Sequence, residues 1–153
     1  MIYTAAAVKA ACNAVMANLF PGMKIYGNTV LDGYTRPSWF AELLVNPYTR
    51  PGKYTHEYSY TYKVTLLETT HNEASCLSAF DQIRAGFGQR LNVAGGGLVV
   101  ESVEMDWIDE RNDILQVTID FYPVSEISGR TENGDLMEDL ALETTFEEGK
   151  LNG

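Results

Sequence analysis

One stretch of the chain, residues 54–68, alternates between two kinds of side chain, YTHEYSYTYKVTLLE. Apolar or aromatic residues occupy every second position, at Tyr58, Tyr60, Tyr62, Val64 and Leu66. A period of two places successive side chains on opposite faces of a β-strand. Aromatic and β-branched residues suit a pleated surface that is buried on one side. The pattern therefore predicts one long strand from Tyr54 to Glu68, which requires other strands as partners.

The remaining segments predict those partners and two helices. Helices are expected at residues 4–19, capped by Thr4, and at 72–86, after a capping box formed by Thr70 and Glu73. Leu77 and Ile83 fall on the apolar face of the second helix. The other predicted strands are residues 24–27, 38–46, 98–108 and 113–123. The glycine-rich stretch at 92–97 is predicted as a flexible connection, and it is no phosphate cradle because a strand follows it.

This order of elements, α-β-β-β-α-β-β, predicts the class of fold. A chain of 153 residues is typical of one domain. We expect an α+β domain over residues 1–123, with a mostly antiparallel sheet of about five strands and two helices packed on one face. In the strand at 98–108, Val99, Val103, Met105 and Trp107 share a parity and are expected on the same face.

The last part of the chain, residues 124–153, differs in composition from the rest. It carries 8 acidic and 2 basic side chains and so supplies −6 of the net charge of −10. We expect an acidic C-terminal extension that docks on a neighbouring subunit or partner. Met137 and Leu140 belong to a short amphipathic turn within it and are the candidate contacts.

Charge and composition exclude several classes of function. An acidic chain lacks the clustered lysine and arginine needed to neutralise phosphates, so nucleic-acid binding is not expected. No apolar run approaches the about 18 residues of a membrane span, and the N-terminus lacks a basic leader, so synthesis in the cytoplasm is expected. Cys12 and Cys76 are predicted to be free buried thiols. Because neither lies in a cysteine or histidine motif, no metal site or cofactor is predicted.

Catalytic motifs are also missing from the sequence. His56 and His71 are interpreted as surface or capping residues rather than general bases. No hydrolase, metalloprotease or nucleotide-binding signature occurs. The sequence therefore predicts no enzyme, although a pocket in which Glu104 or Asp106 meets either histidine would change that.

Two charged segments are candidate interaction sites. The loop NPYTRPGK at 46–53 carries Tyr48, Arg50 and Lys53, and it is either a solvated hairpin tip or a projecting arm that contacts an acidic partner. An acidic cluster near the last hairpin consists of Glu101, Glu104, Asp106, Asp109 and Glu110. It is either a solvated face, a docking surface or, through Glu104 and Asp106, a cation site. The tyrosine face of residues 58–62 is likewise either core or a surface between subunits.

Six sequence segments together resemble a known family. They are FPGMKIYGN, GYTRPSWFAELL, YTHEYSYTYKVTLL, CLSAFDQI, GGGLVVESVEMDWID and ILQVTIDFYPV. The chain is similar over about residues 4–123 to the small tail terminator, or tail completion, proteins of tailed phages and phage-tail-like particles. The segment after Val124 has no counterpart in that resemblance.

The resemblance implies a structural virion protein that forms a closed ring, typically a hexamer. Such a ring caps the tail tube, stops its polymerisation and provides the surface that joins the head, without cofactor or catalysis. The implied partners are the tail tube protein, the sheath protein if the tail is contractile, and the head–tail connector in a complete phage. The implied location is the head-proximal end of the tail. Alternatives are another connector or head-completion protein, or a small-ligand-binding α+β module.

Overall fold

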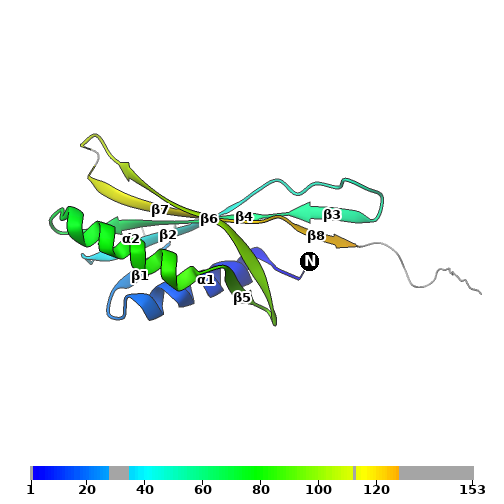
Figure 1. The fold of residues 1–153 in the computed structure, drawn as a ribbon, viewed down its shortest axis with the longest axis horizontal. Helices are drawn as coiled ribbons and strands as arrows, with labels where there is room; N and C mark the ends of the chain where they lie inside the picture. The colour runs from blue at the N-terminus through cyan, green and yellow to red at the C-terminus, as the bar shows by residue number, and fades with distance from the viewer. Residues whose placement is uncertain (1, 28–34, 112, 128–153) are drawn as a thin grey trace, which may run out of the picture. The chain divides into compact units, whose positions relative to one another are not determined.

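The computed structural model describes residues 2–27, 35–111 and 113–127 (Figure 1). Within them the chain forms two helices and eight strands. The elements are α1 (Ala5–Leu19), β1 (Lys24–Tyr26), β2 (Ser38–Val45), β3 (Thr55–Tyr58), β4 (Tyr60–Leu67), α2 (Glu73–Phe87), β5 (Arg90–Val93), β6 (Gly96–Ile108), β7 (Ile114–Phe121) and β8 (Val124–Ile127). Neither helix is long and apolar enough to cross a membrane.

The chain divides into two compact units. The first contains Met1–Pro47 and Ser59–Pro123, and the second contains Tyr48–Tyr58 and Val124–Gly153. The first unit holds a six-stranded sheet in the order β1-β2-β4-β7-β6-β5, and the described part of the second holds the antiparallel pair β3-β8. The α+β class is confirmed. The predicted sheet was wrong in detail, because it has six strands and is mixed: β1 lies parallel to β2 and the other neighbours are antiparallel.

Both helices cover one face of the main sheet, as predicted (Figure 1). The hydroxyl of Tyr62, on the central strand β4, donates a hydrogen bond to Asn13 of α1 at 2.5 Å. The Tyr62 ring also lies 6.1 Å from the ring of Phe87 in α2. Tyr62 is completely buried. Burying so large an aromatic ring between sheet and helices contributes strongly to the core.

The two helix starts differ in how well the sequence predicted them. The Thr4 hydroxyl accepts a hydrogen bond from the Ala7 backbone N–H at 3.3 Å, so the predicted cap of α1 is confirmed. The predicted capping box before α2 is wrong. Asn72 is the cap there, and its side chain accepts from the Ser75 backbone N–H at 3.1 Å. Asparagine caps a helix as well as serine or threonine does, which made the position ambiguous in the sequence.

The buried face of α2 is also rotated from the prediction. Its buried residues are Cys76, Ala79, Ile83 and Phe87. Leu77 is 43 % exposed. The spacing of three and four residues is helical in both cases, so the periodicity identified the helix but not which small residues face the sheet.

The prediction of one long strand is wrong, because the strand is interrupted at one residue, Ser59, which separates β3 from β4. The alternation continues through the break, since Tyr58 and Tyr60 are both buried. What changes is the pairing partner: β4 pairs with β2 and β7, whereas β3 pairs with β8. At the transition the Asn46 backbone N–H donates to the Ser59 carbonyl at 3.1 Å. The two-residue period of the side chains shows that the segment is extended, but it does not show with which other strand each part of the segment pairs.

The strand β8 was not predicted, since the last strand expected from the sequence ended at residue 123. Residues 124–127 pair with β3 in the register Val124↔Tyr58 to Ile127↔Thr55. The short strand follows Pro123, which ends the pairing of β7 because proline has no backbone N–H to donate.

The glycine-rich stretch at 92–97 is not a flexible connection but part of a hairpin. β5 and β6 pair from Val93↔Gly96 to Arg90↔Val99. Between them Ala94 and Gly95 have φ values of 51° and 80°. Positive φ at both central residues is the requirement of a tight two-residue hairpin turn.

A β-bulge at Glu101 changes which residues of β6 face the helices. The register with β7 shifts between Val100 and Ser102. Before the bulge Leu98 is buried and Val99 is 50 % exposed. The predicted common face is therefore wrong for Val99, because one extra residue moves every side chain on one side of it to the opposite face. Beyond the bulge the prediction is confirmed, since Val103, Met105 and Trp107 pair with buried Ile119, Val117 and Leu115.

Candidate functional site

The second unit contains a buried polar network. His56 is 4 % exposed, and its Nε2 lies 3.2 Å from Oε1 of Glu126. The hydroxyl of Tyr58 donates to Oε2 of the same carboxylate. The ring of Tyr48 stacks on His56 with centroids 5.0 Å apart. The interpretation of His56 as a surface or capping residue is therefore wrong. Its imidazole is buried, and the Glu126 carboxylate on the neighbouring strand satisfies its hydrogen-bonding capacity there.

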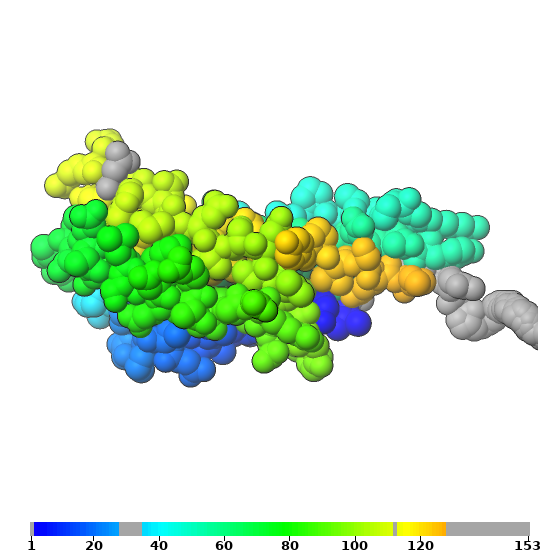
Figure 2. All heavy atoms as spheres, in the orientation of Figure 1, coloured from blue at the N-terminus to red at the C-terminus, as the bar shows by residue number. Residues whose placement is uncertain are grey.

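The basic loop of the second unit is fixed at its base. Thr49 and Glu57 exchange two backbone hydrogen bonds of 2.9 and 2.8 Å. Further out, Arg50 Nη2 donates to the Lys53 carbonyl at 3.2 Å, and Lys53 Nζ lies 5.3 Å from the ring of Tyr54. Both cations are exposed, and the loop and β3 (teal) lie at the surface in Figure 2. Neither forms a salt bridge with any residue that the structure describes, so both charges remain available to a partner.

The predicted acidic cluster lies in the first unit. Glu104 and Asp106 share the face of β6 that points away from the helices, opposite Thr118 and Gln116. Asp109 and Glu110 follow in the turn, and Glu101 occupies the bulge. All five carboxylates are exposed, and within the described ranges none forms a salt bridge. Met137 and Leu140, the candidate contacts of the acidic extension, lie outside the described residues.

The sheet face opposite the helices is polar and hydrogen-bonded across strands. Thr61 donates to Asp120 at 2.6 Å, and Gln116 donates to Thr65 at 3.3 Å. One cross-strand row runs Glu42, Lys63, Thr118 and Glu104 on adjacent strands. In the described chain neither helix packs on this face. It is a surface of mixed charge, on which Phe40 of β2 lies opposite Thr65, and it is suited to contacts rather than to catalysis.

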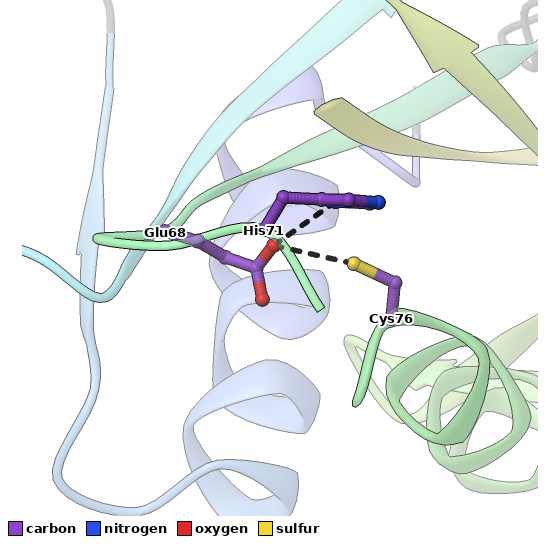
Figure 3. A group of neighbouring side chains, drawn as sticks. All are labelled: Glu68, His71 and Cys76. Carbon is purple, nitrogen blue, oxygen red and sulfur yellow. Dashed lines mark hydrogen bonds and ion pairs between the residues drawn. The ribbon is translucent and has the colours of Figure 1, made fainter. Parts of the chain in front are cut away.

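A third cluster was not expected from the sequence and consists of Glu68, His71 and Cys76 (Figure 3). The Cys76 thiol donates to Glu68 Oε1 at 3.3 Å, and His71 Nδ1 lies 3.8 Å from the same oxygen. Cys76 is completely buried. Burial, followed by the hydrogen bond and charge of Glu68, raises the pKa of the Cys76 thiol to about 12. Spacings of three and five residues match no standard metal motif, which explains why the sequence did not reveal the cluster.

The cluster borders a cavity of about 370 Å³. His71 and charged residues of both signs line it, the latter being Arg36, Glu68, Asp109, Arg111 and Asp113. The carboxylates that share this cavity with His71 are thus Glu68, Asp109 and Asp113, and neither Glu104 nor Asp106, the partners that an enzyme was expected to need, is among its lining residues. No nucleophile with an adjacent base is assembled among the described lining residues.

A second cavity of about 310 Å³ lies beside α2 and is lined partly by Phe20, Trp39, Leu66 and Gln82. The buried indole Nε1 of Trp39 has no hydrogen-bond partner. This cavity and the one beside Glu68 are the described candidates for a site that binds a small ligand.

Comparison with known proteins identifies the family. A family profile described as "Phage tail terminator protein" matches residues 7–133. No curated protein matches the sequence. Among solved structures, the chain is similar to a chain of the "virion of native gene transfer agent (GTA) particle", with 14 % identity, a TM-score of 0.48, and coverage of 84 % of this chain and 100 % of that one. The profile match spans most of the sequence, and the chain therefore belongs to the phage tail terminator family, which is a family of structural tail proteins and not of enzymes.

Proposed function

We propose that the chain assembles into a closed ring, a hexamer, that caps the tail tube at its head-proximal end. The ring stops tube polymerisation and offers the surface to which a head–tail connector binds in a complete phage. The observation that carries the proposal is the family match over residues 7–133. In a contractile tail the sheath protein is a further partner.

The charge distribution supports a ring. A ring of identical subunits joins two different surfaces, so one face of each subunit must complement another face of the next. The loop with Arg50 and Lys53 and the cluster from Glu101 to Glu110 have opposite charge and are unpaired within the described chain. We infer that the loop of one subunit meets the acidic cluster of its neighbour.

Charge alone does not hold such an interface. Exposed ion pairs contribute about 0–1 kcal/mol each, so their main effect is on the orientation and rate of association. The affinity then comes from apolar contacts, for which exposed Tyr48 and Tyr54 of the same loop are suited. The acidic extension, through Met137 and Leu140, provides the second contact, to a neighbouring subunit or to another tail component.

The first experiment reverses the charges of the loop. Arg50→Glu with Lys53→Glu should prevent ring formation, measured as particle mass by native mass spectrometry, while circular dichroism of the subunit stays unchanged. The matched control, Arg50→Lys with Lys53→Arg, keeps both charges and should assemble normally. Adding Glu104→Lys and Asp106→Lys to the reversed loop should restore part of the assembly. A reversed loop that assembles like the natural one would contradict this interface.

The second experiment tests the terminator role itself. Gold-labelled protein should be found by electron microscopy at one end of each isolated tail. Tails assembled without the chain should vary in length. Label distributed along the tube, or tails of uniform length without the chain, would refute the role of terminator.

A further inference from the structure

We propose that Glu68, His71 and Cys76 form a binding site for a divalent transition-metal ion of the zinc type. The ligands are a carboxylate oxygen, the imidazole Nδ1 and the thiolate sulfur. This set of one oxygen, one nitrogen and one sulfur is borderline in softness, which favours zinc over magnesium or calcium. Three protein ligands leave a fourth position for water from the adjoining cavity.

The distances fit such a site. The three ligand atoms all lie within 4.8 Å of one another. With bonds of about 2.0–2.3 Å at tetrahedral angles, ligand atoms around zinc are separated by roughly 3.4–3.6 Å. The observed separations from Glu68 Oε1 are 3.3 Å to Cys76 Sγ and 3.8 Å to His71 Nδ1. In Figure 3 the interactions of His71 and Cys76 meet at that one oxygen, so the three ligand atoms surround a common point.

The surrounding structure holds the ligands in place. Glu68 directly follows β4, His71 lies in the turn, and Cys76 lies in the first part of α2, so three consecutive parts of the chain converge. Arg36 Nη1 donates to the Glu68 carbonyl at 3.0 Å. The ring of Trp107 meets the His71 ring edge-on, with centroids 5.6 Å apart. Supporting contacts of this kind fix the orientation of metal ligands.

Metal binding has a defined proton balance. Without metal, the Cys76 S–H donates its hydrogen to Glu68. When the ion binds, the metal–sulfur bond replaces the S–H bond and one proton is released to solvent. The ion would tie the end of β4 to the start of α2, which stabilises the folded chain through linkage.

The test uses the full-length chain without a polyhistidine tag, after treatment with a chelator. Cobalt(II) is added first, because a cobalt–thiolate bond gives a charge-transfer absorption that oxygen ligands do not give. We expect this absorption at one ion per chain, its loss when Zn²⁺ is added, and release of one proton per ion. Zn²⁺ should also raise the unfolding temperature.

Variants assign the absorption to the site. Cys76→Ser should abolish it, whereas Cys12→Ser should keep it, since Cys12 is in no comparable group of ligands among the described residues. His71→Gln should weaken Zn²⁺ affinity by at least about tenfold. Mutation of a residue that only supports a metal ligand already lowers affinity by about that factor, and His71 is proposed as a ligand itself. The His71 side chain is 38 % exposed, so this variant keeps its fold even if Cys76→Ser does not.

Three outcomes would overturn the proposal. They are no charge-transfer absorption in the natural chain, an absorption lost in Cys12→Ser instead of Cys76→Ser, and unchanged Zn²⁺ affinity in His71→Gln. Ions that bind only to the acidic carboxylates would give the first outcome. All readouts are made on the isolated chain, so they are independent of ring formation.

Discussion

Glu126 Oε1 lies 3.2 Å from His56 Nε2, although the two residues are 70 positions apart. They face each other directly across β3 and β8 in the register His56↔Glu126. The same carboxylate accepts the hydroxyl of Tyr58, so one acidic side chain satisfies two buried polar groups. A shift of one residue would place Glu126 on the opposite face and break both of these hydrogen bonds, so the pair favours the observed register of the second unit.

Glu126→Ala should therefore loosen β3 and β8. The variant loses the hydrogen bonds of two buried groups to the carboxylate, at a cost of about 1–3 kcal/mol, which corresponds to amide hydrogen exchange in these strands that is faster by about 5-fold to 150-fold. The matched control is Glu57→Ala, on the other face of β3. This variant loses only an exposed hydrogen bond, which the Ser125 hydroxyl donates to Glu57 Oε2 at 3.1 Å. The control should change exchange far less, and equal effects of both variants would contradict the importance of the buried network.

Deletion of Glu101 should disrupt the β5–β6 hairpin. Without the bulge residue, Leu98 and Val100 would turn away from the helices, and loss of burial costs about 1.5–3 kcal/mol for each large apolar side chain. The expected result is a lower midpoint in urea unfolding. The substitution Glu101→Ser keeps the bulge and should leave stability within about 0.5 kcal/mol. A deletion variant as stable as the substitution would show that the bulge does not set the register.

Ile83 and Leu77 test the orientation of α2. Ile83 is completely buried and Leu77 is 43 % exposed. Ile83→Ala should lower the free energy of unfolding by about 2–5 kcal/mol, because it leaves a cavity. Leu77→Ala should change it by less than about 1 kcal/mol. The comparison is made by urea unfolding of the isolated subunit. Equally large effects of both variants would support the helix face predicted from sequence, which contains both residues.

High pH should destabilise the subunit. Burial raises the pKa of the Cys12 thiol above its ordinary 9.0, and burial followed by Cys12 raises the pKa of the Tyr62 hydroxyl above 10.0. Above these ordinary pKa values both groups keep their protons in the folded state and lose them in the unfolded state. Their contribution to the free energy of unfolding is therefore fully present below pH 9 and decreases above it. Each contributes a slope of up to about 1.4 kcal/mol per pH unit.

Urea unfolding between about pH 8 and 11 measures that slope. Cys12→Ala removes one of the contributing groups, among which the Cys76 thiol with its raised pKa also counts, and should make the decline shallower above pH 9, whatever the stability of the variant at neutral pH. An unchanged slope in Cys12→Ala would show that this thiol does not couple folding to pH.

The sequence by itself determined the class of fold, both helices, most strands and the family. These follow from local patterns, namely the alternation around Tyr62 and the helical spacing from Val8 to Leu19. The sequence also indicated that the acidic residues of β6 and the basic residues of the loop at 46–53 are exposed. Charged side chains on the polar side of a strand or in a loop are exposed whichever strands pair with that segment.

Only the tertiary structure decided which segments meet. The break at Ser59 depends on where β2 stops and β8 begins, and a two-residue period is the same on both sides of it. Glu126 reaches His56 because β8 pairs with β3, and Cys76 reaches Glu68 because α2 starts where Asn72 caps it. Hydrogen bonds and metal geometry depend on separations of a few ångströms, and residue spacing along the chain fixes such separations only within a single element.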